Sequence, residues 1–215
     1  MSEPKPYLEE LEQDALTELV NIGVSRAAAS LRKMIGHQVL LSVPALEIVS
    51  RKAAATLIRE RETGDLVAVR QDFEGAFSGR ALLIFPEANS LALVRAVTGD
   101  ELDHEGVLEI EDEALSETGN IVLYGCLASM ANMLRRPLDM SLPQVVRGDG
   151  QVLFELAEHD AEDGVVLFLY INFSVSGRDI RGYIAMLMDL PSIEALRVLI
   201  AEFLERIVGG EPDAA

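Results

Sequence analysis

The stretch Asp14-Ala-Leu-Thr-Glu18-Leu-Val-Asn21-Ile22, followed by Ser42-Val-Pro44, returns later in the chain as Glu113-Ala-Leu-Ser-Glu117-Thr-Gly-Asn120-Ile121, followed by Ser141-Leu-Pro143. One offset of 99 residues aligns segments 14–44 and 113–143 without a gap, and ten of the 31 aligned positions are identical. The chain of 215 residues therefore contains an internal repeat, and its fold is expected to consist of two similar halves.

The repeated polar residues carry more information than the repeated apolar ones. A helix that packs against a core needs apolar residues at helical spacing, and Leu16 and Val20 supply them in the first copy. Packing does not require the same carboxylate and the same carboxamide, three residues apart, in both copies. Asn is also a mediocre helix residue, because its side chain competes for the backbone. The repetition therefore predicts a function performed at two equivalent places.

The remaining sequence predicts the same order of elements in each half. In the first half we expect a helix, a strand, a two-stranded hairpin and a second helix, at 8–35, 39–43, 66–73 with 80–85, and 86–99. The corresponding elements of the second half are expected at 110–134, 138–146, 165–173 with 181–188, and 191–209. Segment 51–61 reads as either a short helix or a connection, and 100–109 as an acidic loop. Pro44 and Pro143 should mark a sheet edge, a bend or a change of strand pairing.

Strands flanked by helices indicate an α+β fold with a largely antiparallel sheet. We expect residues 1–215 to form one domain made of two α-β-β-β-α repeats, at about 7–99 and 110–209, that share a sheet flanked by helices. A pseudo-two-fold axis would then relate the halves and place the two Glu-x-x-Asn helices at equivalent positions.

Composition limits the classes of function. The net charge of −18 disfavours binding to phosphate backbones, so nucleic acid is an unexpected partner. Cys126 is the single cysteine, which excludes an intramolecular disulfide and fits a reducing compartment. The longest strongly apolar run, 165–171, is too short to span a bilayer. We therefore expect a cytoplasmic protein without membrane insertion.

The chemistry of the repeated pair is restricted. Positions i and i+3 are neighbours on a helix, so Glu18 lies beside Asn21, and Glu117 beside Asn120. A carboxamide cannot act as a general base, but it can orient a water molecule, and the carboxylate can pair with a cation. The sequence offers no Ser-His-Asp set, no pair of His residues at metal-ligand spacing and no Gly-rich phosphate loop.

The pattern Asp-x-x-x-Glu-x-x-Asn, with Pro after 22 intervening residues, resembles the signature of the CheC/CheX/FliY family of chemotaxis phosphatases. The first copy matches it throughout, and the second departs only at Glu113, where the family usually has Asp or Ser. Two intact Glu/Asn pairs resemble the CheC branch more than CheX. With 215 residues, we also expect the chain to lack the additional C-terminal domain of FliY.

The resemblance implies a hydrolase of two-component signalling that acts on the aspartyl phosphate of a CheY-type response regulator. It implies that Asn21 and Asn120 position the in-line water, and that Glu18 and Glu117 dock the receiver. Asp14 and Glu113, one turn earlier, either help docking or simply favour the positive helix N-terminus. The receiver supplies its own Mg²⁺, so no metal or cofactor of this chain is implied.

Two non-enzymatic alternatives remain open at this point. The chain could be an adaptor that binds a CheD-type receptor deamidase, or a module that binds a phosphorylated receiver without dephosphorylating it. If the enzyme reading holds, we expect the second site to be at least as active as the first. Thr118-Gly119 precedes Asn120 where the bulkier Leu19-Val20 precedes Asn21, which suggests less crowding beside the second Asn.

Overall fold

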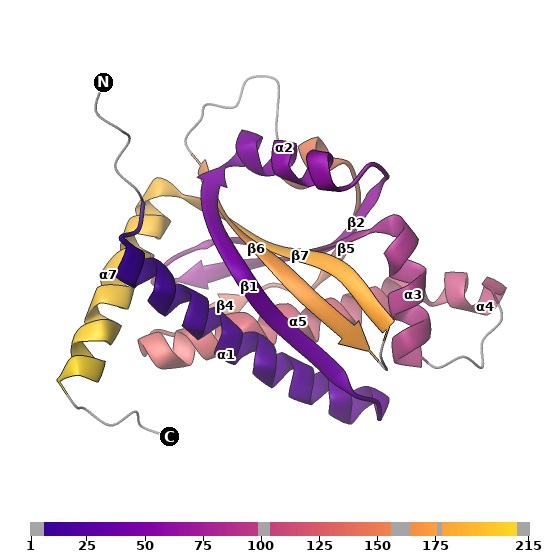
Figure 1. Ribbon diagram of the computed structural model, residues 1–215, viewed down its shortest axis with the longest axis horizontal. Helices are drawn as coiled ribbons and strands as arrows, with labels where there is room; N and C mark the ends of the chain where they lie inside the picture. The colour runs from indigo at the N-terminus through magenta and orange to yellow at the C-terminus, as the bar shows by residue number, and fades with distance from the viewer. Residues whose placement is uncertain (1–6, 99–103, 156–163, 176–177, 210–215) are drawn as a thin grey trace.

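An antiparallel sheet of seven strands forms the centre of the protein (Figure 1). The computed structural model describes residues 7–98, 104–155, 164–175 and 178–209. The strands are β1 (Val39–Ser50), β2 (Leu66–Gly75), β3 (Gly79–Pro86), β4 (Leu138–Met140), β5 (Gln144–Gly148), β6 (Gly164–Val175) and β7 (Arg178–Asp189). They lie in the order β1-β6-β7-β3-β2-β4, and β5 also pairs with β2. Strands of both halves thus share one sheet, which confirms the predicted α+β class.

Helices cover both faces of this sheet. Four longer helices contribute to the large hydrophobic cluster on one face, namely α1 (Glu10–Ile35), α3 (Glu87–Thr98), α5 (Glu111–Leu134) and α7 (Leu190–Val208). Two shorter helices, α2 (Arg51–Arg61) and α6 (Gly150–Leu153), pack on the opposite face (Figure 1). The helix α4 (His104–Glu109) precedes α5. No helix in the described part of the chain carries an apolar stretch long enough to cross a membrane.

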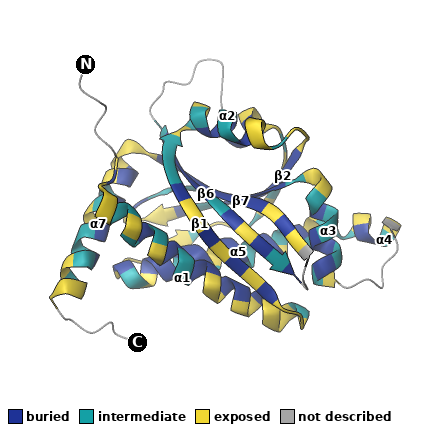
Figure 2. Cartoon of the chain, in the orientation of Figure 1, coloured by how far each residue is buried: buried dark blue, intermediate teal, exposed yellow. Residues whose placement is uncertain are grey.

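The strand β2 shows how the sheet is buried on both sides. Val67, Val69 and Phe73 belong to the large cluster, whereas Leu66 and Ala68 belong to the smaller one beneath α2 and α6. This alternation follows from the two-residue period of a strand. Figure 2 shows the corresponding pattern on the helices, with buried residues towards the sheet and exposed residues outside. Outward-facing helical positions are therefore the ones available to a partner.

Both predicted prolines coincide with irregularities at the sheet edges. The pairing of β1 with β6 shifts its register between Ser42 and Ala45, around Pro44. In the second half, the strand splits into β4 and β5 around Pro143, and both parts pair with β2. Proline has no N–H for a sheet ladder, which explains both interruptions.

The two motif helices cross each other at small residues. Gly23 of α1 lies against the backbone of Cys126, and Gly125 of α5 lies against Ala27. The absence of side chains at these glycines lets the helices approach closely beneath the sheet. Cys126 is fully buried in this contact, and its burial raises the pKa of the thiol to about 12.

Several elements differ from their predicted form. Segment 51–61, ambiguous in sequence, is the helix α2. The expected acidic loop 100–109 contains the helix α4, because Val107 is buried and anchors this turn against the core. Residues 1–6, 99–103, 156–163, 176–177 and 210–215 lie outside the described residues, and with them positions 100–103 of the expected acidic loop.

The start of α7 provides a test of local stability. The Asp189 carboxylate accepts a hydrogen bond from the backbone N–H of Ser192 at 2.8 Å and caps this helix. Hydrogen bonds from Ser192 lower the pKa of the Asp189 carboxyl below its ordinary value of 3.8. Asp189→Ala is expected to lower the free energy of unfolding by about 1 kcal/mol at pH 7.

The pH dependence of that loss has a definite sign. A carboxyl whose pKa is lowered by folding contributes stability above its unfolded pKa and loses it as the pH falls through the folded pKa. The free energies of unfolding of Asp189→Ala and of the unchanged protein, measured with urea, should therefore become more similar as the pH falls towards 3. Asp189→Asn, which keeps an acceptor without titrating, is the control. A loss that does not change with pH would contradict this account.

Candidate functional site

The four predicted carboxylates lie on the outer surface of the two motif helices. Asp14 and Glu18 are exposed on α1, and Glu113 and Glu117 are exposed on α5. They turn away from the sheet, because Leu16, Leu19 and Val20 of α1 occupy the buried face together with Leu115 of α5. Exposure of both Glu side chains leaves them available to a cation on another molecule.

Asn21 does not project freely into solvent. It is half-buried, and its carboxamide bonds to the backbone of Val43 at both ends. Its Oδ1 accepts from the Val43 N–H at 2.9 Å, and its Nδ2 donates to the Val43 carbonyl at 3.1 Å. The same Nδ2 also donates to the Thr17 carbonyl at 3.1 Å. Both hydrogens of this amide are therefore used within the protein.

The irregularity in β1 explains this arrangement. Val43 lies at the register shift and has no ladder partner in β6, although its side chain is buried. A buried backbone group without a hydrogen bond is costly, so another group must satisfy it. The Asn21 carboxamide has a peptide's donor and acceptor and takes the place of the missing strand. Asn21 is therefore turned towards β1 and is not free to position a water, which departs from the role that the resemblance implied for the first copy.

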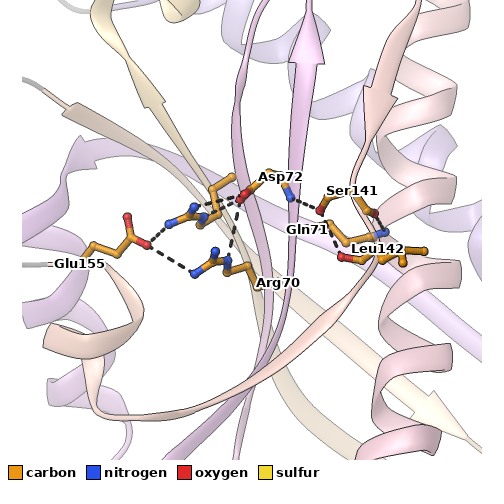
Figure 3. Close-up of polar contacts among 7 residues, drawn as sticks. Arg70, Gln71, Asp72, Ser141, Leu142 and Glu155 are labelled. Carbon is orange, nitrogen blue, oxygen red and sulfur yellow. Dashed lines mark hydrogen bonds and ion pairs between the residues drawn. The ribbon is translucent and has the colours of Figure 1, made fainter.

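Asn120 is held differently. It is also half-buried, but its Oδ1 accepts a hydrogen bond from Nε2 of Gln71, on strand β2, at 3.0 Å. The same Nε2 donates to the Ser141 carbonyl at 3.0 Å, as Figure 3 shows for Gln71 and Ser141. The Nδ2 of Asn120 has no hydrogen-bond partner among the described residues. The amide nitrogen of the second copy is therefore available, whereas that of the first is occupied.

Close packing of α5 on the sheet brings these groups together. A Cβ added at Gly119 would lie 2.5 Å from Cγ1 and 2.6 Å from Cγ2 of Val69, which is far too close. Only glycine permits α5 to approach β2 to this extent, and Gln71 is two residues from Val69. The predicted relief of crowding beside Asn120 is wrong, because Thr118 and Gly119 face the core and not the site.

The surroundings of the two copies also differ. Tyr124 is 57% exposed one turn after Asn120, and Leu142 is 85% exposed next to Ser141. Their equivalents in the first repeat are Ser25 and the buried Val43. At these two equivalent positions, therefore, only the second copy has accessible apolar side chains.

A shallow depression on the outer side of α1 surrounds the first motif. Its lining residues are Glu18, Asn21, Ile22, Ser25, Arg26 and Ala29. Arg26 brings a positive charge here, whereas the second repeat has Gly125 at this position. No three His, Cys, Asp or Glu side chains meet as a metal site within the described ranges.

Ion pairs stiffen the strand that carries Gln71. Asp72 accepts from Nε of Arg80 at 2.6 Å, and its backbone N–H donates to Oγ of Ser141 at 2.9 Å (Figure 3). Arg70 and Arg80 both pair with Glu155. The hydrogen bond from Arg80 lowers the pKa of the Asp72 carboxyl, so the Asp72 carboxylate stays ionised at neutral pH. Gln71 therefore occupies a well-held position between β3 and the edge strand.

The sequence motif did not include Gln71. A usable signal was present, because Gln71 falls on the same face of β2 as Val67, Val69 and Phe73 and interrupts an otherwise apolar pattern. A buried polar residue at such a position needs a partner. That partner, Asn120, is 49 residues away in sequence and becomes apparent only in the folded chain.

Comparisons with known proteins agree with this fold. No family model matches the chain. It is 23% identical over 207 residues to CheY-P phosphatase CheC of Bacillus subtilis, over 92% of this chain and 97% of that protein. It is 24% identical over 151 residues to the putative CheY-P phosphatase CheC1 of Halobacterium salinarum, over 69% and 74% of the two chains.

A solved structure is similar over nearly the whole chain. The crystal structure of Thermotoga maritima FliY superposes with a TM-score of 0.67 and 18% identity, covering 91% of this chain and 98% of that one. At this identity the likeness concerns the fold. Together with the sequence relatives, it confirms the predicted resemblance to the CheC and FliY proteins.

Proposed function

We propose, on the premise that this chain belongs with the CheC and FliY chemotaxis proteins, that it is a hydrolase that removes the aspartyl phosphate of a CheY-type response regulator. The observation that carries the proposal is the second copy of the motif. There an exposed Glu117 stands beside Asn120, whose amide nitrogen has no partner in the described part of the chain, while Gln71 holds its oxygen.

The chemistry suits these groups. Phosphoryl transfer depends on alignment and charge stabilisation more than on covalent catalysis. An uncharged carboxamide can hold a water in line with phosphorus without repelling the phosphoryl oxygens. Positioning of this kind can supply several kcal/mol. Asn120, and Asn21 after release from Val43, are proposed to do this.

The carboxylates are proposed to bind the receiver. Glu117 and Glu18 would pair with a lysine of the receiver, and Glu113 and Asp14 extend the acidic face by one turn. Tyr124 and Leu142 would add apolar contact around the second site. Mg²⁺ would come with the receiver. The reaction would take place in the cytoplasm, a reducing compartment in which a single cysteine stays as a free thiol.

The direct test follows the decay of a phosphorylated CheY-type receiver with and without this protein. We expect phosphate release to accelerate with catalytic amounts of the chain. If the receiver is bound and its phosphate lifetime is unchanged or longer, the protein is a binding module. If no receiver is bound and a CheD-type deamidase is, it is an adaptor. Either of these outcomes overturns the proposal.

A further inference from the structure

The geometry points to Gln71 as a positioning residue of the second site: it holds the Asn120 carboxamide by its oxygen, so that the amide nitrogen faces the receiver. This inference rests on the proposed phosphatase function and deepens it. The residue lies on β2, outside both copies of the motif, and its action on the reacting water would pass through Asn120.

The hydrogen bonds of Gln71 support this role. Its Nε2 uses one hydrogen on Oδ1 of Asn120 and the other on the Ser141 carbonyl, both at 3.0 Å. The Ser141 carbonyl therefore anchors the donor, and the donor orients Asn120. With its oxygen engaged, the Asn120 carboxamide keeps one rotamer and presents Nδ2 for a further bond. A donor at the oxygen also polarises the amide and strengthens the bond that its N–H can make.

The position of Gln71 is unfavourable for stability alone. The side chain is 1% exposed, and its Oε1 is buried without a hydrogen-bond partner. A buried polar atom left without a partner lowers the stability of the folded chain. An apolar residue would avoid this cost, as the neighbouring helix-facing residues Val69 and Phe73 do. The polar side chain is therefore explained by what its amide group donates to.

The first half of the molecule shows what happens without this donor. Asp72 faces Ser141 across the β2 edge, and Asn172 faces Ser42 across the β6 edge. Because Ser42 and Ser141 are aligned positions of the repeat, their partners Asn172 and Asp72 are equivalent as well. The residues before them are Gln71 and Ile171. Ile171 has no donor, and in that half the Asn carboxamide closes on the backbone of Val43. A single Gln-for-Ile difference thus accompanies the two orientations of the motif Asn.

The test compares Gln71→Met, which keeps length and removes both donors, with Asn120→Ala, which sets the activity remaining without the second site. For Gln71→Met we expect kcat to fall about tenfold, with KM for the phosphorylated receiver within twofold of the unchanged protein. Ile171→Met, the same replacement at the equivalent position of the other half, should leave kcat unchanged. Urea unfolding checks that each variant is folded.

The pH dependence of the activity of Gln71→Glu gives a second test, because a purely structural role of Gln71 would not make that activity depend on pH. A protonated carboxyl in this buried position can donate one hydrogen to Asn120, whereas the ionised form can donate none. We expect its activity, relative to the unchanged protein at each pH, to fall as the pH rises. A ratio that is constant with pH, or a Gln71→Met variant with full kcat, overturns the inference.

The outcomes separate this inference from the proposed function. If Asn120→Ala removes most of the activity and Gln71→Met removes none, only the role of Gln71 is wrong. If Asn120→Ala leaves the rate unchanged, the second site is not where hydrolysis occurs, and the proposed function of that site fails with it.

Discussion

Asn120→Ala is expected to lower kcat for receiver dephosphorylation by about 100-fold, the size typical of losing one group that stabilises a transition state. Asn21→Ala should cost far less activity. The reason lies in the hydrogen bonds of the two amides. Nδ2 of Asn120 has no partner among the described residues, whereas the Asn21 carboxamide is bonded at both ends to Val43.

The size of this inequality can be estimated. Releasing Asn21 from Val43 breaks two hydrogen bonds of about 1 kcal/mol each. A total of about 2 kcal/mol corresponds to about a thirtyfold smaller population of the released form. The first site would then act only in a minor fraction of molecules, unless a bound receiver favours its release. The double variant, without either Asn, should dephosphorylate the receiver no faster than buffer does.

For the free energy of unfolding we expect the opposite order, with Asn21→Ala more damaging than Asn120→Ala. Asn21→Ala leaves the buried backbone of Val43 unpaired at the β1 irregularity, so we expect it to lower the free energy of unfolding by about 1–3 kcal/mol. Asn120→Ala should cost less, since the one side-chain hydrogen bond that Asn120 makes within the described residues is to another side chain. Equal activity losses for both single variants, once unfolding is accounted for, would contradict the proposed inequality.

A matched control separates docking from catalysis. Glu117→Ala removes an exposed carboxylate next to Asn120 without touching the core. It should raise the receiver concentration needed for half-maximal rate and leave kcat nearly unchanged. Asn120→Asp should be at least as inactive as Asn120→Ala, because a negative charge would repel the phosphoryl oxygens. An active Asp variant would argue against water positioning by an uncharged amide.

Gly119→Ala is expected to lower the free energy of unfolding by about 2 kcal/mol, although alanine is a better helix residue than glycine by about 1 kcal/mol. The new Cβ would meet both γ carbons of Val69, at 2.5 and 2.6 Å. Valine is branched at Cβ and held in the sheet, so it cannot turn aside. The helix α5 must then move away from β2, which also lengthens the Asn120–Gln71 contact.

Gly125→Ala is the control for that substitution. It lies on the same helix and gains the same helix propensity. Its new Cβ would be 3.0 Å from the Cβ and 3.3 Å from the Cα of Ala27, contacts much less severe than those with Val69, which a shift of a few tenths of an ångström between α1 and α5 relieves. Its effect on urea unfolding should stay within about 1 kcal/mol. We expect only Gly119→Ala to reduce phosphatase activity as well as stability. Equal effects of both variants would show that α5 packs against β2 less tightly than described.

Much of the architecture could be predicted from residue patterns. Helical spacing of apolar residues located both motif helices, and alternation located the hairpins β2–β3 and β6–β7. Pro44 and Pro143 marked the places where pairing changes, since proline cannot donate to a ladder. The sequence did not predict that 51–61 is a helix or that α4 exists, because short helices depend on tertiary packing more than on their own propensity.

The amino-acid sequence by itself determined that the protein is a duplication, that its halves share an antiparallel sheet, and that Glu and Asn recur on two equivalent helices. These follow from local spacing, which a linear pattern records. Only the tertiary structure decided how each carboxamide is oriented. Val43 and Gln71, which decide it, reach the Asn residues from strands 22 and 49 positions away, across contacts that exist only in the folded chain.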